Sequence, residues 1–188
     1  MARVKNPANR GAIFKAAVRE IAEAGLGAPT AKIAKRAGIA SGTLFTYFPT
    51  KEVLLNELYL ELKAEVYARV NEEFPHSAGL KLRTRHVWSS FLNWAIEFPE
   101  KRKVSMQLNL SDVITAGTRL KAAEGRGTID RTLGDLREQG ILRELPAGFA
   151  AATMSAMQET TMDFIARKPK QREELIERAF EVYWRAVK

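Results

Sequence analysis

The sequence predicts an all-α protein of about nine helices. Apolar residues recur three and four positions apart along most of the 188 residues, which is the spacing of one helix face. Glycines and prolines separate these runs, as expected where one helix ends and the next begins. Hydrophobic residues make up 46% of the chain and charged residues 28%, a composition that is ordinary for a globular protein. The chain is therefore expected to fold into helices around a sizeable core.

The first helix is expected to run from Pro7 to about Gly25. Asn6 before Pro7 is typical of a helix start, because proline is favoured at the first helical position. The apolar residues that follow form a single stripe, made of Ile13, Phe14, Ala17, Val18, Ile21 and Ala22. This helix is expected to pack across the next two and to fix their angle.

Two short helices joined by a tight corner are expected between Thr30 and Pro49. Thr30 is interpreted as the N-cap of the first and Ser41 as the cap of the second. Gly38 is expected to end the first helix, because glycine adopts a left-handed backbone without a Cβ clash. The apolar positions have the spacing of a helix-turn-helix: Ile33, Ala34, Ala37, Ile39 and Leu44. The second helix is then expected to enter the major groove of DNA.

A purely structural helical hairpin could carry the same corner, but two features favour DNA. The outward positions of the second short helix hold small or hydroxyl-bearing residues, which allow close approach to bases: Ala40, Ser41, Gly42, Thr43 and Thr46. Residues 1–51 contain nine basic and two acidic residues, whereas the rest of the chain contains 21 and 20. The excess positive charge therefore surrounds this motif, as expected for a protein that binds a polyanion.

Roles follow from these positions. The small outward residues are expected at base edges, and Thr30, Tyr47 and Lys51 at phosphates, where they fix register without reading sequence. Lys32, Lys35 and Arg36 are expected to add a general, salt-sensitive attraction. The basic arm of residues 1–6 is either a solvated tail or an extension that reaches the duplex.

The run from Arg10 to about Tyr59 resembles the TetR (AcrR-type) family of bacterial transcriptional regulators. The matching motifs are Ile13-Phe14-x-x-Ala17, Ala24-Gly25, Ile33-Ala34-x-x-Ala37-Gly38-Ile39, Gly42-Thr43-Leu44-Phe45-x-Tyr47-Phe48 and Lys51-Glu52-x-Leu54-Leu55. In this family position 45 is usually a tyrosine that helps to hold DNA. Phe45 keeps the ring of that DNA-binding residue and lacks its hydroxyl. The resemblance implies an N-terminal three-helix helix-turn-helix domain, residues 1–50, followed by a helical ligand-binding and dimerisation domain, residues 51–188.

Longer helices are expected after the two short ones. Thr50 and Glu52 favour the start of the first, by capping and by interaction with the helix dipole. Gly140 is expected to cap a weaker helical region, and Pro146 to start the next helix. The expected ranges are 51–74, 80–98, 99–110, 111–139, 147–167 and 170–188.

The last two helices carry more apolar surface than one contact requires. An antiparallel pair of this kind suggests a four-helix bundle formed with a second copy, although both helices could instead cover their own core. The resemblance likewise implies a two-fold dimer, which would need a roughly palindromic operator. The candidate interface residues are Phe149, Phe164, Ile176, Phe180, Tyr183 and Trp184.

The resemblance also implies a small-molecule effector that binds among the middle helices. Methionine and aromatic residues at helical spacing fit either the lining of such a pocket or an ordinary core. The candidate lining is Trp88, Phe91, Met106, Met154, Met157, Gln158 and Met162.

Other functions have less support in the sequence. There is no cysteine, so disulfides and thiolate zinc sites are excluded, and His76 and His86 have no carboxylate at ligand spacing. No nucleophile and base pair or phosphate loop is recognisable, so no catalytic residue, metal or cofactor is predicted. The N-terminus lacks the apolar core of a secretory signal, and no run is long enough to span a membrane.

The resulting expectation is a cytoplasmic, homodimeric repressor that a small molecule releases from DNA. The alternative is a non-enzymatic helical protein that binds a ligand or RNA.

Overall fold

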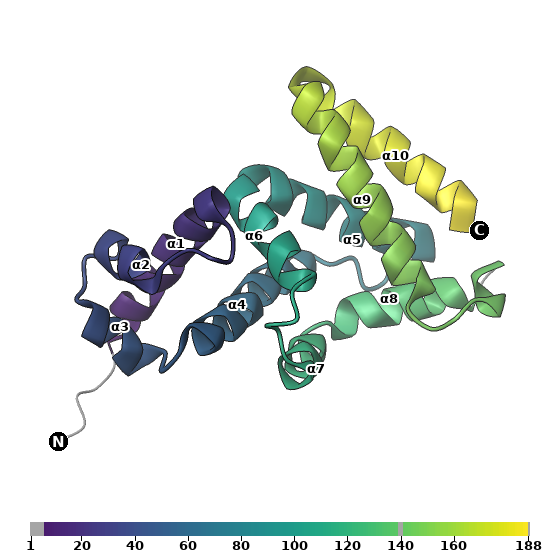
Figure 1. The fold of residues 1–188 in the computed structure, drawn as a ribbon. Helices are drawn as coiled ribbons and strands as arrows, with labels where there is room; N and C mark the ends of the chain where they lie inside the picture. Colours follow the sequence, from purple (N-terminus) through teal and green to yellow (C-terminus); the bar gives the residue numbers. More distant parts are fainter. Residues whose placement is uncertain (1–5, 139–140, 188) are drawn as a thin grey trace. The chain divides into compact units, whose positions relative to one another are not determined.

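The computed structural model describes residues 6–138 and 141–187, and these residues form an all-α fold (Figure 1). The predicted fold class is therefore confirmed. The α-helices are α1 Pro7–Ala24, α2 Thr30–Arg36, α3 Ser41–Tyr47, α4 Lys51–Asn71, α5 Leu80–Glu97, α6 Pro99–Asn109, α7 Ala116–Glu124, α8 Gly127–Arg137, α9 Phe149–Arg167 and α10 Arg172–Val187. Two 3₁₀ helices, η1 Ile141–Glu144 and η2 Pro169–Gln171, precede α9 and α10.

The described residues hold ten α-helices, where about nine were expected. The region 111–139 was expected to be a single weak helix, and it contains two, α7 and α8. Gly125 and Gly127 lie at the break between them, where glycine lowers the cost of leaving the helix. Gly140 and its predicted cap lie outside the described residues.

The chain divides into two compact units. The first contains residues up to Ala64 together with Phe98–Ala123, and the second contains Glu65–Glu97 and Glu124–Lys188. Helix α4 contributes to both. The predicted division into a DNA-binding domain, residues 1–50, and a ligand-binding and dimerisation domain, residues 51–188, stays a prediction.

In the first unit, α1 packs against α2 and α6, and α2 packs against α3. The predicted stripe of α1 is buried, with Ile13, Ala17 and Ile21 fully enclosed. Phe14 and Phe48 meet with ring centroids 5.3 Å apart. These contacts hold α3 against α1 through its apolar side.

The caps of the two short helices differ from the prediction by one residue. Pro29 and Ala40 are the N-caps of α2 and α3, and neither donates or accepts a side-chain cap hydrogen bond. Both have extended backbones, with ψ of 134° and 148°, so Thr30 and Ser41 become the first helical residues. The prediction for Asn6 is confirmed, because its side chain accepts a hydrogen bond of 2.9 Å from the amide of Ala8.

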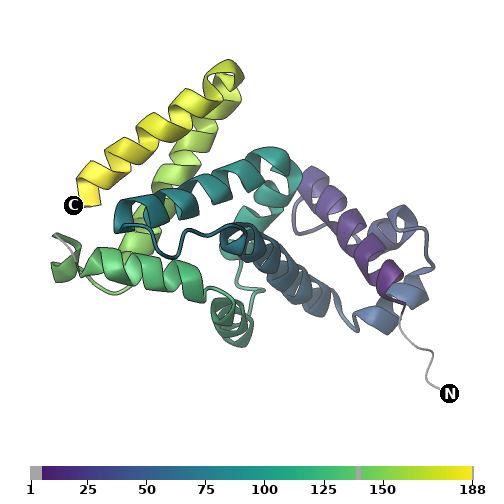
Figure 2. The same cartoon turned by 180° about the vertical axis from the view of Figure 1, so that it is seen from behind.

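In the second unit, α9 and α10 run side by side, as both views show (Figures 1 and 2). Both pack against α5, and α8 packs against α5 and α9. The indole of Trp88 is fully buried at the centre and stacks on Tyr183 at 5.7 Å. Burial raises the pKa of the Tyr183 phenol above its usual range.

Candidate nucleic-acid interface

Helix α3 presents the predicted small residues to the surface. Ser41, Gly42 and Thr46 are exposed, as is Ala40 just before the helix, and Thr43 is half-buried. A Cβ at Gly42 would meet no heavy atom within 4 Å. The Thr46 hydroxyl donates a hydrogen bond of 3.1 Å to the carbonyl oxygen of Gly42. The outer surface of α3 is thus formed by small, exposed side chains, which would allow its backbone to approach a duplex closely.

Two apolar side chains hold α3 in place from below. Leu44 has no exposed surface and Phe48 has 3%. Phe45 points the other way and is 43% exposed, although it is a large aromatic residue. The helix therefore separates a buried anchoring side from an exposed side that includes the Phe45 ring.

The corner between α2 and α3 is built as predicted at Gly38. Its φ is +71°, a left-handed conformation that favours glycine. The amide of Gly38 donates to the carbonyl oxygen of Lys35 at 3.1 Å, and the amide of Ile39 donates to that of Ala34 at 3.0 Å. These hydrogen bonds satisfy carbonyl groups at the end of α2 and fix the direction in which α3 starts.

Arg36 forms ion pairs within the first unit, and its predicted role in general attraction stays a prediction. Its guanidinium donates to Glu20 at 2.6 Å and to Glu23 at 2.9 Å, both on α1. Glu20 is only 7% exposed, so its carboxylate depends on this partner. The hydrogen bond with Glu20 also raises the pKa of Arg36 above its ordinary value. Lys32 and Lys35 remain exposed on the surface of α2.

A second ion-pair group joins α1 to α4. The Arg10 guanidinium donates to Glu61 at 3.0 Å and to Glu57 at 3.2 Å. The same guanidinium lies over the Phe14 ring, 4.4 Å from its centroid. Arg10 is therefore held by α4, and its charge is compensated within the first unit.

The first turn of α4 carries Lys51, which is predicted to contact a DNA phosphate. Lys51 is its first residue and is half-buried. The hydroxyl of Thr50 accepts a hydrogen bond of 3.3 Å from the amide of Val53, which confirms its predicted capping role. The Thr50 side chain also lowers the pKa of Glu52 by hydrogen bonding to its carboxylate. An ammonium at this helix start lies where backbone N–H groups favour an anion.

The Tyr47 hydroxyl accepts a hydrogen bond of 2.8 Å from the amide of Asn6. Asn6 is the N-cap of α1, so this bond ties the end of α3 to the start of α1. Thr30, expected at a phosphate like Tyr47, is half-buried at the start of α2. Both phosphate roles stay predictions.

Two residues that hold the first unit together were not identified in the sequence. The Lys103 ammonium donates to the carbonyl oxygen of Ala22 at 2.6 Å. The Asn56 amide donates to the carbonyl oxygen of Val113 at 2.8 Å and accepts from the amide of Thr115 at 3.1 Å. Each contact joins segments more than 50 positions apart, so no local pattern could have indicated it.

The predicted effector-binding residues are divided between the two units. Trp88, Met154, Gln158 and Met162 are buried in the second unit, and the Gln158 amide donates to the Trp88 carbonyl oxygen at 3.2 Å. Phe91 and Met157 are half-buried. Met106 lies on α6 in the first unit and is 38% exposed. The four buried residues are packed as core, and their role in binding stays a prediction.

Half of the residues predicted at a dimer interface belong to the core of a single chain. Ile176, Phe180 and Tyr183 are at most 6% exposed, and the rings of Phe180 and Tyr183 contact Trp88 on α5. Part of the apolar stripe of α10 therefore covers its own unit, which was the alternative to an interface with a second copy. Phe149 and Phe164 on α9 remain 45% and 47% exposed, and Trp184 is half-buried.

Neither a metal site nor a membrane-spanning helix is found in the residues that the structure describes. No group of three histidine, cysteine, aspartate or glutamate side chains there is arranged to hold a metal ion. None of the helices in the described ranges is long and apolar enough to cross a membrane.

Comparison with known proteins agrees with this geometry. Residues 13–58 match the family described as bacterial regulatory proteins, tetR family. The fatty acid metabolism regulator protein of Bacillus subtilis (strain 168) is 40% identical over 70 residues, which are 37% of this chain and 36% of that protein. The matched segment thus spans about a third of the length of that relative.

Solved structures extend the similarity along the chain. A putative tetR family transcription regulator from Shewanella sp. PV-4 has a TM-score of 0.84 and 25% identity, covering 95% of this chain and 97% of that chain. The regulator FadR of Bacillus subtilis, solved in complex with stearoyl-CoA, shares the fold with a TM-score of 0.73 at 23% identity, covering 92% and 96%. Residues 13–58 therefore form a segment of the tetR family of bacterial regulatory proteins, and the chain as a whole has the fold of a TetR-family regulator.

Proposed function

We propose that the chain binds a specific DNA duplex through α3 and represses transcription as a homodimer until a small molecule binds. The observation that carries the proposal is the two-sided character of α3. Leu44 and Phe48 anchor the helix, while Ser41, Gly42 and Thr46 lie open on its outer side. A helix held in this way can enter a major groove without unfolding its support.

The charges around α3 support a nucleic-acid partner. Lys32 and Lys35 are exposed on α2, and Lys51 begins α4. Arg10 and Arg36 are compensated by glutamates of the first unit. The attraction to phosphate is therefore assigned to the three lysines, and each is expected to contribute about one unit to the salt dependence of binding.

A gel-shift titration tests sequence-specific binding. The probe is a duplex from beside the gene of this protein, compared with a scrambled duplex of equal length and with a structured RNA. The proposal predicts the tightest binding to the first duplex and a weaker, salt-sensitive binding to the second. Equal affinity for the two duplexes would refute sequence specificity, and preference for the RNA would favour the alternative of an RNA-binding protein.

A homodimer is supported by the apolar surface left on the last two helices. Phe149 and Phe164 on α9 and Val182 on α10 are each at least 45% exposed. Large apolar side chains left exposed on neighbouring helices are available for contact with a second copy. Light scattering of the intact chain is expected to give twice the mass of one chain, and Phe164→Glu is expected to shift it towards the monomer. A monomeric wild-type chain would remove the argument for a palindromic operator.

The first effector to test is a long-chain acyl-CoA. One TetR-fold relative was solved with stearoyl-CoA, and the relative that is 40% identical over 70 residues is a fatty acid metabolism regulator protein. Stearoyl-CoA added to a preformed DNA complex is expected to release the duplex, while free coenzyme A and stearate serve as controls. A complex that persists with all three would exclude this class of effector and leave DNA binding unaffected. A regulator of chromosomal genes would act in the cytoplasm.

A further inference from the structure

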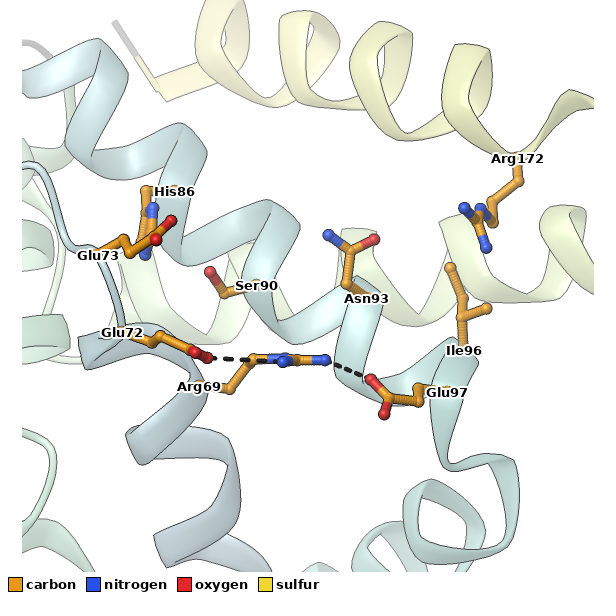
Figure 3. A pocket seen from close by; sticks show the side chains of 9 residues that line it. All are labelled: Arg69, Glu72, Glu73, His86, Ser90, Asn93, Ile96, Glu97 and Arg172. Carbon is orange, nitrogen blue, oxygen red and sulfur yellow. Dashed lines mark hydrogen bonds and ion pairs between the residues drawn. The ribbon is translucent and has the colours of Figure 1, made fainter.

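An open cleft of about 790 Å³ lies on the second unit (Figure 3). This volume falls in the range of small-molecule sites. The cleft is separate from the buried residues around Trp88, none of which lines it. It is formed by the end of α4, one face of α5 and Arg172 at the start of α10.

The shape of the cleft follows α5. His86, Ser90, Asn93 and Ile96 line it at intervals of four, three and three residues, which places them on one face of the helix. At a rise of about 1.5 Å per residue, this row is about 15 Å long. The imidazole Nε2 of His86 is 2.9 Å from the carbonyl oxygen of Val70, so the ring is held in place at one end. An elongated ligand fits this row better than a compact one.

In the middle of the cleft wall, the positive charge of Arg69 is neutralised by neighbouring glutamates. Arg69 lies between Glu72 and Glu97 and forms an ion pair with each, as Figure 3 shows. The Asn93 side chain projects beside this group and makes no hydrogen bond with another side chain or backbone group among the residues that the structure describes. Its amide can both donate and accept, and the Ser90 hydroxyl can do the same.

The two ends of the cleft carry opposite charges. Glu73 lies beside His86 and has no ion pair within the described part of the chain. Its φ is +53°, an uncommon conformation for a residue with a Cβ, and such strain is often found at functional sites. At the other end, Arg172 is 3.7 Å from its neighbour Glu173, whose side chain is 90% exposed. A pair of this kind is weak, so the guanidinium remains able to bind an anion.

We propose that this cleft binds an elongated molecule with an ammonium group at one end and a carboxylate at the other, and that a short extended peptide is the matching class. The ammonium would pair with Glu73 and the carboxylate with Arg172. Three extended residues span about 10 Å, which leaves room for the two side chains to reach the peptide ends. Ser90 and Asn93 would bond the peptide groups between them, and Ile96 offers the one aliphatic contact on the α5 row.

The test is a calorimetric titration of the intact chain with tri-alanine, combined with amide NMR spectra. Binding is expected to shift the resonances of Ser90 and Asn93. N-acetylation or C-amidation of the peptide is expected to weaken binding at least about tenfold, because each removes a charge-assisted contact. Glu73→Gln should abolish the effect of acetylation, and Arg172→Gln should abolish the effect of amidation.

Two control variants test whether the effects on peptide binding are specific to the cleft. Glu124→Gln and Arg185→Gln remove the same charges from exposed positions outside the cleft and should keep the wild-type affinity. Thermal melts of all four variants identify any that fail to fold. Blocked peptides that bind as well as tri-alanine, or no binding at millimolar peptide, would overturn the proposal. The measurement needs no DNA, so it stands apart from the proposed regulatory function.

Discussion

The Lys103 ammonium on α6 donates a hydrogen bond of 2.6 Å to the carbonyl oxygen of Ala22, two residues before the end of α1. The last carbonyl groups of a helix lack partners within it and lie at its negative end. A lysine from another element therefore caps α1 and joins it to α6. The start of α1 is tied to α3 through Asn6 and Tyr47, so both ends of this helix are fixed.

Lys103→Met should lower the free energy of unfolding by about 1 kcal/mol, since it removes this charge-assisted bond and keeps the aliphatic chain. For a chain of this size, that corresponds to a fall in Tm of about 2–4 °C. Thermal melting followed by circular dichroism measures the change. Lys121→Met, at an exposed position of α7, is the control and should melt as the wild type does. Equal melting of both variants would show that the Lys103 contact adds no stability.

Arg36 and Lys35 are neighbours in the sequence with different expected effects. Arg36→Gln should lower the Tm, because the buried carboxylate of Glu20 loses its partner. Lys35→Gln should leave the Tm unchanged and weaken DNA binding, with the slope of log K against log salt smaller by about one. Melting curves and salt titrations on the same two proteins separate these outcomes. If Arg36→Gln kept the wild-type Tm and reduced the slope of log K against log salt, Arg36 would be a DNA-binding residue.

Lys51 and Thr43 are expected to differ in what they contribute to binding. Lys51→Ala removes a phosphate contact, so affinity should fall by a similar factor for the specific and the scrambled duplex. Thr43→Ala should instead reduce the ratio of the two affinities by about tenfold, the usual scale for a base contact. Gel-shift titrations of both variants on both duplexes provide the comparison. Unchanged affinity in both variants would contradict the docking of α3 described above.

Phe45→Tyr should strengthen DNA binding. The ring is 43% exposed on the outer side of α3, so a hydroxyl can be added there without disturbing the core. One added hydrogen bond to the duplex is expected to raise affinity about fivefold, with no change in Tm. Phe48→Tyr is an informative contrast, because Phe48 is buried and the same hydroxyl there should destabilise the protein. A Phe45→Tyr variant that binds no better would show that this ring does not reach a hydrogen-bonding group of the DNA.

The start of α4 should show a measurable pH response. The Thr50 hydroxyl lowers the pKa of Glu52, so the ionised carboxylate is favoured in the folded state. Its contribution to stability is therefore complete above the unfolded pKa and is lost as the pH falls through the lowered folded value. Thr50→Val should move the pKa of Glu52 back towards its ordinary value, which an NMR titration of the carboxyl carbon can measure. An unchanged titration curve would assign the shift to the helix start alone.

Local signals in the sequence predicted much of the first unit. Asn6 with Pro7, the glycine at 38 and Pro99 each act within a few residues, and the structure places helix ends at or beside all three. The caps predicted at Thr30 and Ser41 are wrong by one residue, because the extended residues Pro29 and Ala40 precede each helix and take the cap position.

Contacts between distant segments could not be predicted in the same way. The partners of Arg36 and Lys103 depend on how α1 packs against α2 and α6, which no spacing encodes. The apolar stripe of α10 likewise showed how much surface must be covered, and not that α5 would cover Phe180 and Tyr183. Surface chemistry such as that of the α3 face was easier to infer, because it needs no partner within the chain.

The hydrogen bonds of Trp88 limit which residues can replace it as the sequence of this protein changes in evolution. Its carbonyl oxygen accepts from Gln158 on α9, and its indole nitrogen donates to the carbonyl oxygen of Ile176 on α10 at 3.1 Å. Among the twenty amino acids, only tryptophan combines a ring system of this size with an uncharged N–H donor. Descendants that acquire a new effector can be expected to vary the residues around this side chain and to retain the tryptophan itself.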